Sequence, residues 1–281
     1  MREISSKIIE NSIKALFIDA NYNLGESECD IIKKAHDRES SETGKNILGV
    51  ILENLETASE LNIPICQDTG MAIVIAEVGQ DVHVIGDDFE TAINNGVRSA
   101  YTDGYMRASV VRDPLFDRKN TKDNTPAIIH TRIVPGDKIK LTALPKGFGS
   151  ENMSAIKMFK PSATREDVIN YVVDTVKSAG SNPCPPIQIG VGIGGSFDYA
   201  PYLAKLALSR GVGTRNGNEN YAQLELDILS RVNEIGIGPQ GFGGDTTALD
   251  VSVEYYPTHI AGLPVAVNIN CHVMRHKTAV I

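Results

Sequence analysis

Three of the four cysteines stand in settings that could do chemistry. Cys66 precedes an amide and an acid in PICQDTG, Cys184 lies among prolines in NPCPPIQIG, and Cys271 closes the run AVNINC. Each follows an apolar or extended approach and stands where a strand is expected to end in a turn. Cys29 lies among charged residues of an expected helix with no motif around it, so we interpret it as structural or incidental.

Three converging thiolates would suit a soft metal, above all an iron–sulfur cluster. With only three cysteine ligands, one iron keeps an open position and can act as a Lewis acid toward a substrate oxygen. The separations, 184 − 66 = 118 and 271 − 184 = 87 residues, mean that only the fold could gather these cysteines. Spacing alone therefore leaves open that each is simply a small buried hydrophobe. The absence of a CxxC pair argues against a zinc ribbon or a thioredoxin-type site.

Five motifs along the chain resemble those of the class I, iron–sulfur fumarate hydratases. In order they are PICQDTG, KGFGSENMS, NPCPPIQIGVGIGG, GIGPQGFGGDTTALDV and INCHVMRH. The resemblance covers essentially the whole chain from about residue 5 onward. It is closest to the alpha subunit of the two-subunit form, a layout shared with L(+)-tartrate dehydratase.

The resemblance implies a [4Fe–4S] cluster whose fourth iron binds substrate oxygens, with the ligands Cys66, Cys184 and Cys271. It also implies that Gln67 and Asp68, in the QDTG segment, lie near the substrate. Asp68 would then be the acid that protonates the departing hydroxyl group. From the residues alone, Asp68 could instead simply cap the turn that follows it.

The resemblance further assigns His259 as the partner of that acid and Arg107 as the cation that grips a substrate carboxylate. The loop KGFGSEN should lend a backbone amide to the substrate from Gly147 or Gly149. Phe148 departs from the small residues expected in this loop, which leaves the donor open. Without the resemblance, His259 could be a hydrogen-bonded core histidine, and Arg107 could be half of a surface ion pair.

Single-chain members of that family continue into a second domain that carries the remaining catalytic groups. We therefore interpret residues 1–281 as a single alpha-subunit domain, completed by a beta subunit in an expected heterotetramer of two alpha and two beta subunits. The expected reaction is the reversible hydration of fumarate to malate, a citric acid cycle step, by an oxygen-sensitive enzyme. The alternatives are the alpha subunit of L(+)-tartrate dehydratase, an iron–sulfur electron carrier or oxygen sensor, and a scaffold without metal.

Charge and composition argue against other partners. A net charge of −8 and a pI of about 5.3 make nucleic acid a poor ligand. No apolar stretch approaches the roughly 18–20 residues that span a bilayer, and the start lacks a signal peptide's cleavable segment. The chain is therefore expected to be soluble, cytoplasmic and without disulfides. The glycine clusters GVGIGGSFD and GPQGFGGDTT lack the spacing of nucleotide-binding loops, and tight packing near the cluster or against the partner explains them better.

The residue patterns predict an α+β fold with a helical N-terminal segment, followed by a mixed sheet and helices, as one unit with room for two lobes. Ser27 is expected to cap a helix within the first 60 residues. The remaining expected elements are strands at 71–79 and 82–86, a helix at 87–107, a hairpin at 127–152, a helix at 165–180 capped by Thr164, a strand and helix after 186, a helix at 219–235, and a strand ending at Cys271.

Overall fold

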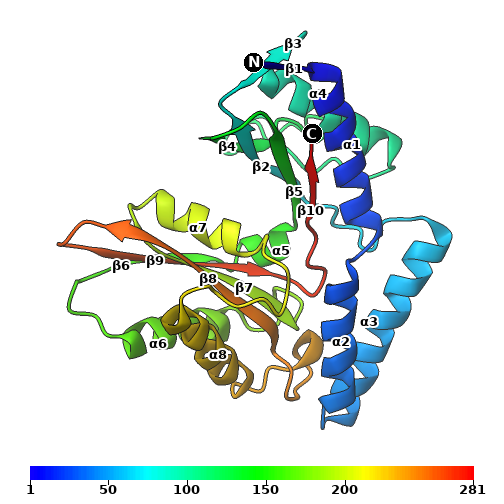
Figure 1. The fold of residues 1–281 in the computed structure, drawn as a ribbon. Helices are drawn as coiled ribbons and strands as arrows, with labels where there is room; N and C mark the ends of the chain where they lie inside the picture. The colour runs from blue at the N-terminus through cyan, green and yellow to red at the C-terminus, as the bar shows by residue number, and fades with distance from the viewer. The chain divides into compact units, whose positions relative to one another are not determined.

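The computed structural model describes all 281 residues, which divide into two compact units. Unit 1 comprises Met1–Leu24, Thr57–Phe148 and Arg275–Ile281, and unit 2 comprises Gly25–Glu56 and Gly149–Met274. Figure 1 labels the helices and strands of both. Each unit combines helices with a mixed sheet, so the predicted α+β class is confirmed.

Unit 1 is built on a four-stranded sheet. Its strands, in order across the sheet, are β10 (Lys277–Val280), β5 (Ile139–Lys146), β2 (Met71–Gly79) and β4 (Ile128–Val134). Strand β2 pairs in parallel with β4 and antiparallel with β5. A separate parallel pair consists of β1 (Arg2–Ser5) and β3 (Val82–Ile85).

The hairpin predicted over 127–152 is wrong, although both of its strands form. Strands β4 and β5 are not neighbours, because β2 lies between them. Residues 72–76 of β2 are all buried, and a strand with a continuous buried run belongs at the centre of a sheet rather than at its edge. The turn at Pro135-Gly136 therefore leads the chain past β2 and not back along β4.

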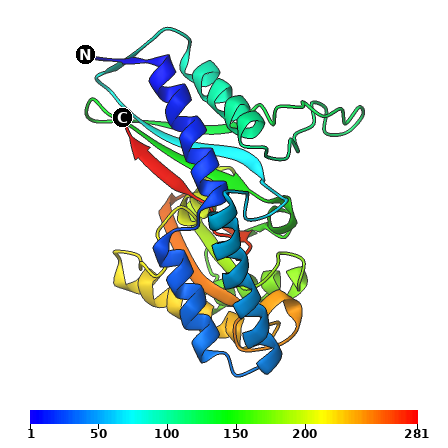
Figure 2. The same ribbon diagram turned by 90° about the vertical axis from the view of Figure 1, so that its right-hand side faces the viewer.

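Helices α1 (Ser6–Tyr22) and α4 (Phe89–Asp103) pack against each other and against this sheet, side by side in Figure 2. The apolar residues of α1 at helical spacing, among them Ile9 and Ile13, are fully buried in the core of unit 1. Gly96 permits the close approach, since a Cβ there would lie 2.5 Å from the Glu10 carbonyl oxygen. The predicted helices α1 and α4 are thus confirmed, whereas Arg2–Ser5, in the N-terminal segment expected to be helical, form the strand β1.

Unit 2 is built on the sheet β6 (Ala155–Phe159), β9 (Leu263–Asn270), β7 (Ile187–Gly195) and β8 (Ala248–Thr258), in that order. Helices α6 (Arg165–Ala179) and α8 (Glu219–Asn233) cover one face, and α7 (Tyr199–Ala207) covers the other (Figure 1). Thr164 caps α6 in a capping box with Asp167, as predicted.

The glycines of GVGIGG serve packing within this unit. A Cβ on Gly190 would lie 2.1 Å from the Ala204 carbonyl oxygen, and one on Gly192 would lie 2.0 Å from that of Ala200. Helix α7 can therefore approach β7 only because these two residues lack side chains. This close packing of α7 on β7 accounts for the first glycine cluster.

The remaining helices are α2 (Glu26–Arg38), α3 (Glu42–Leu61), the short α5 (Phe148–Glu151) and a 3-10 turn, η1 (Pro239–Gly241). Ser27 does not cap α2, because the N-cap is Gly25, two residues earlier, and the Ser27 hydroxyl donates instead to Glu28. None of the helices combines the length and the apolar character that crossing a bilayer requires.

Candidate active site

Asp68 lies in unit 1 on the turn that leads from α3 into β2. The Gly70 N–H donates to its Oδ1 at 3.1 Å, and the Phe148 N–H donates to its Oδ2 at 3.1 Å. The first bond is the turn cap that the sequence had left open. The second ties the carboxylate to the loop KGFGSEN, so both carboxylate oxygens are fixed in place.

Two glycines let this turn and this loop approach each other. Gly70 has a φ of +77°, and a Cβ there would lie 2.7 Å from the Lys146 backbone nitrogen. A Cβ on Gly147 would lie 3.0 Å from Asp68 Oδ2. Gly147 thus leaves room for the carboxylate, while the amide that reaches Asp68 belongs to Phe148. Gly149 belongs to unit 2, and it is exposed.

A buried arginine also binds the backbone of the turn that carries Asp68. Arg275, only 4% exposed, donates through Nη1 to the Asp68 carbonyl oxygen at 2.7 Å and to Asn21 Oδ1 at 2.9 Å. Sequence reasoning missed Arg275, although it stands in the quoted motif INCHVMRH and is the motif's permanently charged residue. It stands four residues after Cys271 and two residues before β10, and its contact with Asp68 is made only by the fold.

Arg275→Met is expected to lower the free energy of unfolding by about 2–4 kcal/mol, because it leaves the buried Asn21 oxygen and the half-buried Asp68 carbonyl without their charged donor. Urea unfolding checks this. Arg2→Met is the matched control, since Arg2 also donates to two backbone carbonyls in unit 1 but at an exposed position, and its loss should be clearly smaller. Equal losses in the two variants would contradict the assigned role of Arg275.

Thr69 joins the turn to the segment that carries Arg107. The Arg107 N–H donates to Thr69 Oγ1 at 3.0 Å, and the Thr69 hydroxyl lies 3.3 Å from the Arg107 carbonyl oxygen. The Tyr101 hydroxyl lies 2.8 Å and 2.9 Å from the carbonyl oxygens of Thr69 and Gly70. Burial raises the pKa of Tyr101 far above its usual range, so the phenol stays a hydrogen-bond donor. The Arg107 backbone is therefore anchored beside Asp68 while its side chain is exposed.

Cys66 precedes Asp68 by two residues on the same turn. Its thiol is half-buried and lies 3.6 Å from Gln67 Oε1, while Gln67 itself is exposed. Cys66, Gln67, Asp68, Arg107 and Gly147, all predicted site residues, thus belong to one unit. Asp68 and Gly147 meet directly, and the Arg107 backbone lies next to Thr69.

The fold brings Cys184 and Cys271 to the same end of the unit 2 sheet. Strands β7 and β9 are antiparallel with Gln188 opposite Asn270, so the start of β7 lies beside the end of β9. His272 Nδ1 lies 3.1 Å from the Cys184 carbonyl oxygen, which joins the two cysteine turns. Cys184 has a φ of +56°, a left-handed conformation that a non-glycine residue adopts only where its surroundings impose it.

His259 lies at the opposite end of β9, on the exposed turn between β8 and β9. Its Nδ1 accepts a hydrogen bond from the Ala261 N–H at 3.1 Å. The strand from Leu263 to Asn270 separates it from Cys271, a length of about 26 Å at about 3.3 Å per residue. Within one chain His259 is therefore far from the sheet end that carries the two cysteines. Its assignment as partner of Asp68 stays a prediction.

Free cysteine thiols are the type of ligand that an iron–sulfur cluster requires. None of the cysteines forms a disulfide, and the thiols of Cys66, Cys184 and Cys271 lie on turns where they are exposed or only half-buried. Neither unit by itself gathers three His, Cys, Asp or Glu side chains that could hold a metal ion. Cys184 and Cys271 belong to unit 2, and Cys66 belongs to unit 1. Burial raises the pKa of Cys29, which keeps that fourth thiol protonated and agrees with a structural role.

The Asp68 carboxylate, fixed by backbone amides, thus lies on the turn of Cys66, and Thr69 of that turn binds the backbone of an exposed arginine. A carboxylate and a cation are the groups that acid–base chemistry on an anion requires. The sequence profile of the family described as fumarate hydratase (Fumerase) matches residues 10–280. A Methanocaldococcus jannaschii protein, provisionally named L(+)-tartrate dehydratase subunit alpha, is 42% identical over 94% of this chain and 94% of its own. The L(+)-tartrate dehydratase subunit alpha of Escherichia coli (strain K12) is 31% identical over 90% of this chain and 84% of its own.

The chain therefore belongs to the fumarate hydratase (Fumerase) family of hydro-lyases. This confirms the resemblance drawn from the five motifs. The match extends over both units, so the Asp68 turn and the two cysteine turns of unit 2 all lie within the family's domain.

Proposed function

We propose that this chain is the alpha subunit of a hydro-lyase that hydrates fumarate reversibly to malate, with a beta subunit completing the active site. The relatives named above are alpha subunits, which supports a partner of this kind. We further propose that the enzyme is cytoplasmic, oxygen-sensitive and assembled from two alpha and two beta subunits.

One observation carries the proposal. The Asp68 carboxylate is held by the Gly70 and Phe148 amides on the turn that also carries Cys66, and the Arg107 backbone is bonded to the same turn. Hydration of a dicarboxylate requires an acid–base group within reach of the hydroxyl group and a cation for a carboxylate. Asp68 and Arg107 supply one of each on adjacent pieces of backbone.

Cys66, Cys184 and Cys271 would hold the cluster that the family resemblance implies. When bound, a [4Fe–4S] cluster with three cysteine ligands supplies one Lewis-acidic iron for a substrate oxygen. The pairing of β7 with β9 already sets two of these cysteines at one sheet end. The third belongs to the turn of Asp68.

The chain's own residues would move one proton and orient the substrate. In the malate-to-fumarate direction, Asp68 gives its proton to the departing hydroxyl, which leaves as water, and in hydration Asp68 takes that proton back. Arg107 holds one substrate carboxylate, with the Gln67 amide beside it. The base that takes the carbon-bound proton would come from the beta subunit. His259 would assist Asp68. Within unit 2, the His259 ring accepts a hydrogen bond from the Ala261 N–H.

A second candidate is the alpha subunit of L(+)-tartrate dehydratase. The names of the relatives favour it, since both the archaeal and the bacterial relative carry that name. Its substrate is also a dicarboxylate and also loses water, so Asp68 and Arg107 would have the same roles. The two candidates differ in the groups that meet the additional hydroxyl.

The experiment that separates them uses the complex of this chain with its co-purified beta subunit, prepared without oxygen. The rates of fumarate hydration and L(+)-tartrate dehydration are compared as kcat/KM. A higher value for fumarate supports the first candidate, and a higher value for tartrate supports the second. A complex that contains its cluster but turns over neither substrate would contradict both.

A further inference from the structure

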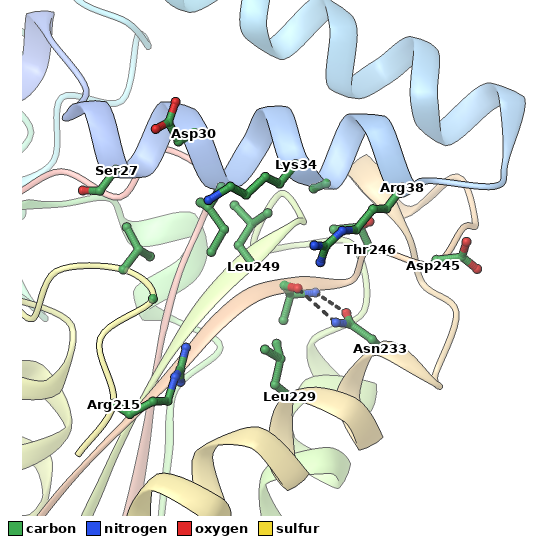
Figure 3. Close-up of a pocket in the computed structure, with 15 residues that line it drawn as sticks. Ser27, Asp30, Lys34, Arg38, Arg215, Leu229, Asn233, Asp245, Thr246 and Leu249 are labelled. Atoms are coloured by element: carbon green, nitrogen blue, oxygen red, sulfur yellow. Dashed lines mark hydrogen bonds between the residues drawn. The ribbon is translucent and has the colours of Figure 1, made fainter. Parts of the chain in front are cut away.

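Unit 2 contains a cavity of about 580 Å³ that none of the predicted site residues lines. It lies between α2, the end of α8 and the start of β8 (Figure 3). Its volume is in the range of pockets that bind small molecules. Part of the glycine-rich segment GPQGFGGDTT, which the proposed function leaves without a role, borders it through Asp245 and Thr246.

Two uncompensated cations line this cavity from α2. Lys34 and Arg38 are four residues apart and therefore share a face of the helix. Both side chains are exposed, and neither has a hydrogen-bond or ion-pair partner in the structure. Figure 3 shows both directed beneath the helix toward the cavity, whereas the carboxylates of Asp30 and Asp245 point away from it.

A third cation stands on the opposite wall in a fixed position. Arg215 donates through Nη1 to the Val251 carbonyl oxygen at 2.8 Å and through Nη2 to Asp250, and it lies 3.6 Å from Glu225. Both acids are fully buried, so they orient Arg215 and balance its charge. Arg215 lines the cavity on the side opposite α2, and in Figure 3 its guanidinium points toward that helix. Arg215 thus adds a preorganised planar donor, while Lys34 and Arg38 leave two positive charges unmatched.

The rest of the lining is suited to a small ligand. Apolar side chains make up much of the wall, including those of Ile31, Leu229 and Leu249. Asn233 is occupied with the backbone of Ala248, as the dashed bonds in Figure 3 show, so it holds the wall in shape. Apolar walls with a few convergent charged groups are typical of ligand pockets.

We propose that this cavity binds a small dianion, whose negatively charged oxygens pair with Lys34 and Arg38 and face Arg215. A dicarboxylate and a phosphate group both meet this description. The planar carboxylate and the tetrahedral phosphate each present two charged oxygens to a guanidinium group. The proposal concerns residues that have no part in the proposed reaction, so it stands or fails independently of it.

Isothermal titration of the full chain with succinate and, separately, with inorganic phosphate tests the proposal. We expect saturable binding of at least one of them, and which one binds identifies the chemistry of the ligand. The double variant K34Q/R38Q should bind it at least about tenfold more weakly, since each lost charge-assisted bond alone is worth that much. K33Q is the matched control, because Lys33 is exposed on the same helix but does not line the cavity.

Two results would overturn the proposal. One is a folded wild-type chain that binds neither probe at millimolar concentration. The other is a K34Q/R38Q variant that binds with wild-type affinity, which would assign the anion to another part of the chain. Lys34 and Arg38 are exposed and unpaired, so circular dichroism should show the variant folded.

Discussion

Cys184→Ser is expected to abolish cluster binding, whereas Cys29→Ser is expected to leave it unchanged. The reason lies in the proposed ligand set, in which a serine hydroxyl cannot replace a soft thiolate. Cys184 projects from a constrained turn beside Cys271, whereas the thiol of Cys29 is half-buried in α2 with a raised pKa. The measurement is iron and acid-labile sulfide per polypeptide after reconstitution without oxygen.

Wild-type protein and Cys29→Ser should each contain close to four of both atoms, as a [4Fe–4S] cluster requires. Cys184→Ser should contain almost none, and hydro-lyase activity should be lost with the cluster. Because both cysteines lie in unit 2, the pair also controls for a general effect of removing a thiol. Equal iron in the two variants would mean that the ligands are misassigned.

Local patterns predicted most of the elements of this fold. The helices at α1, α4, α6 and α8 follow apolar periodicity, and Thr164 caps α6 because its hydroxyl and the Asp167 carboxylate satisfy each other's amides. The pairing of the strands, in contrast, could not be predicted from local patterns. The turn at Pro135-Gly136 indicated a hairpin, but β2, which lies much earlier in the chain and is buried without a break from residue 72 to residue 76, occupies the position between β4 and β5.

The candidate site shows the same division between local and distant signals. Cys66, Asp68 and the Gly147 loop could be identified from motifs, because each motif is contiguous in the chain. The bond from Phe148 to Asp68 joins residues 80 apart, and that from Arg275 joins residues 207 apart. The periodicity of apolar residues does not predict contacts between such distant residues. The placement of His259 at the far end of β9 from Cys271 likewise follows from strand direction, which residue types alone do not reveal.

Asp68→Asn is expected to lower kcat by about 10²–10⁴-fold, the usual contribution of a general acid or base. Asparagine keeps the shape of the side chain but cannot carry the proton. Its NH₂ group would also face one of the two backbone donors, Gly70 N–H or Phe148 N–H, so some stability should be lost as well. The measurement is kcat of the complex with its beta subunit, with the substrate it prefers.

Asp88→Asn is the matched control for this variant. Asp88 also accepts a backbone N–H in unit 1, from Thr91 at 2.9 Å, but it serves only as the N-cap of α4, a role that asparagine fills equally well. Its kcat should equal that of the wild type. If Asp68 merely capped its turn, the folded, cluster-containing Asp68→Asn variant would keep kcat within about tenfold of wild type, since a turn cap takes no part in proton transfer. A large loss of kcat, with iron content unchanged and the fold intact, would instead assign proton transfer to Asp68.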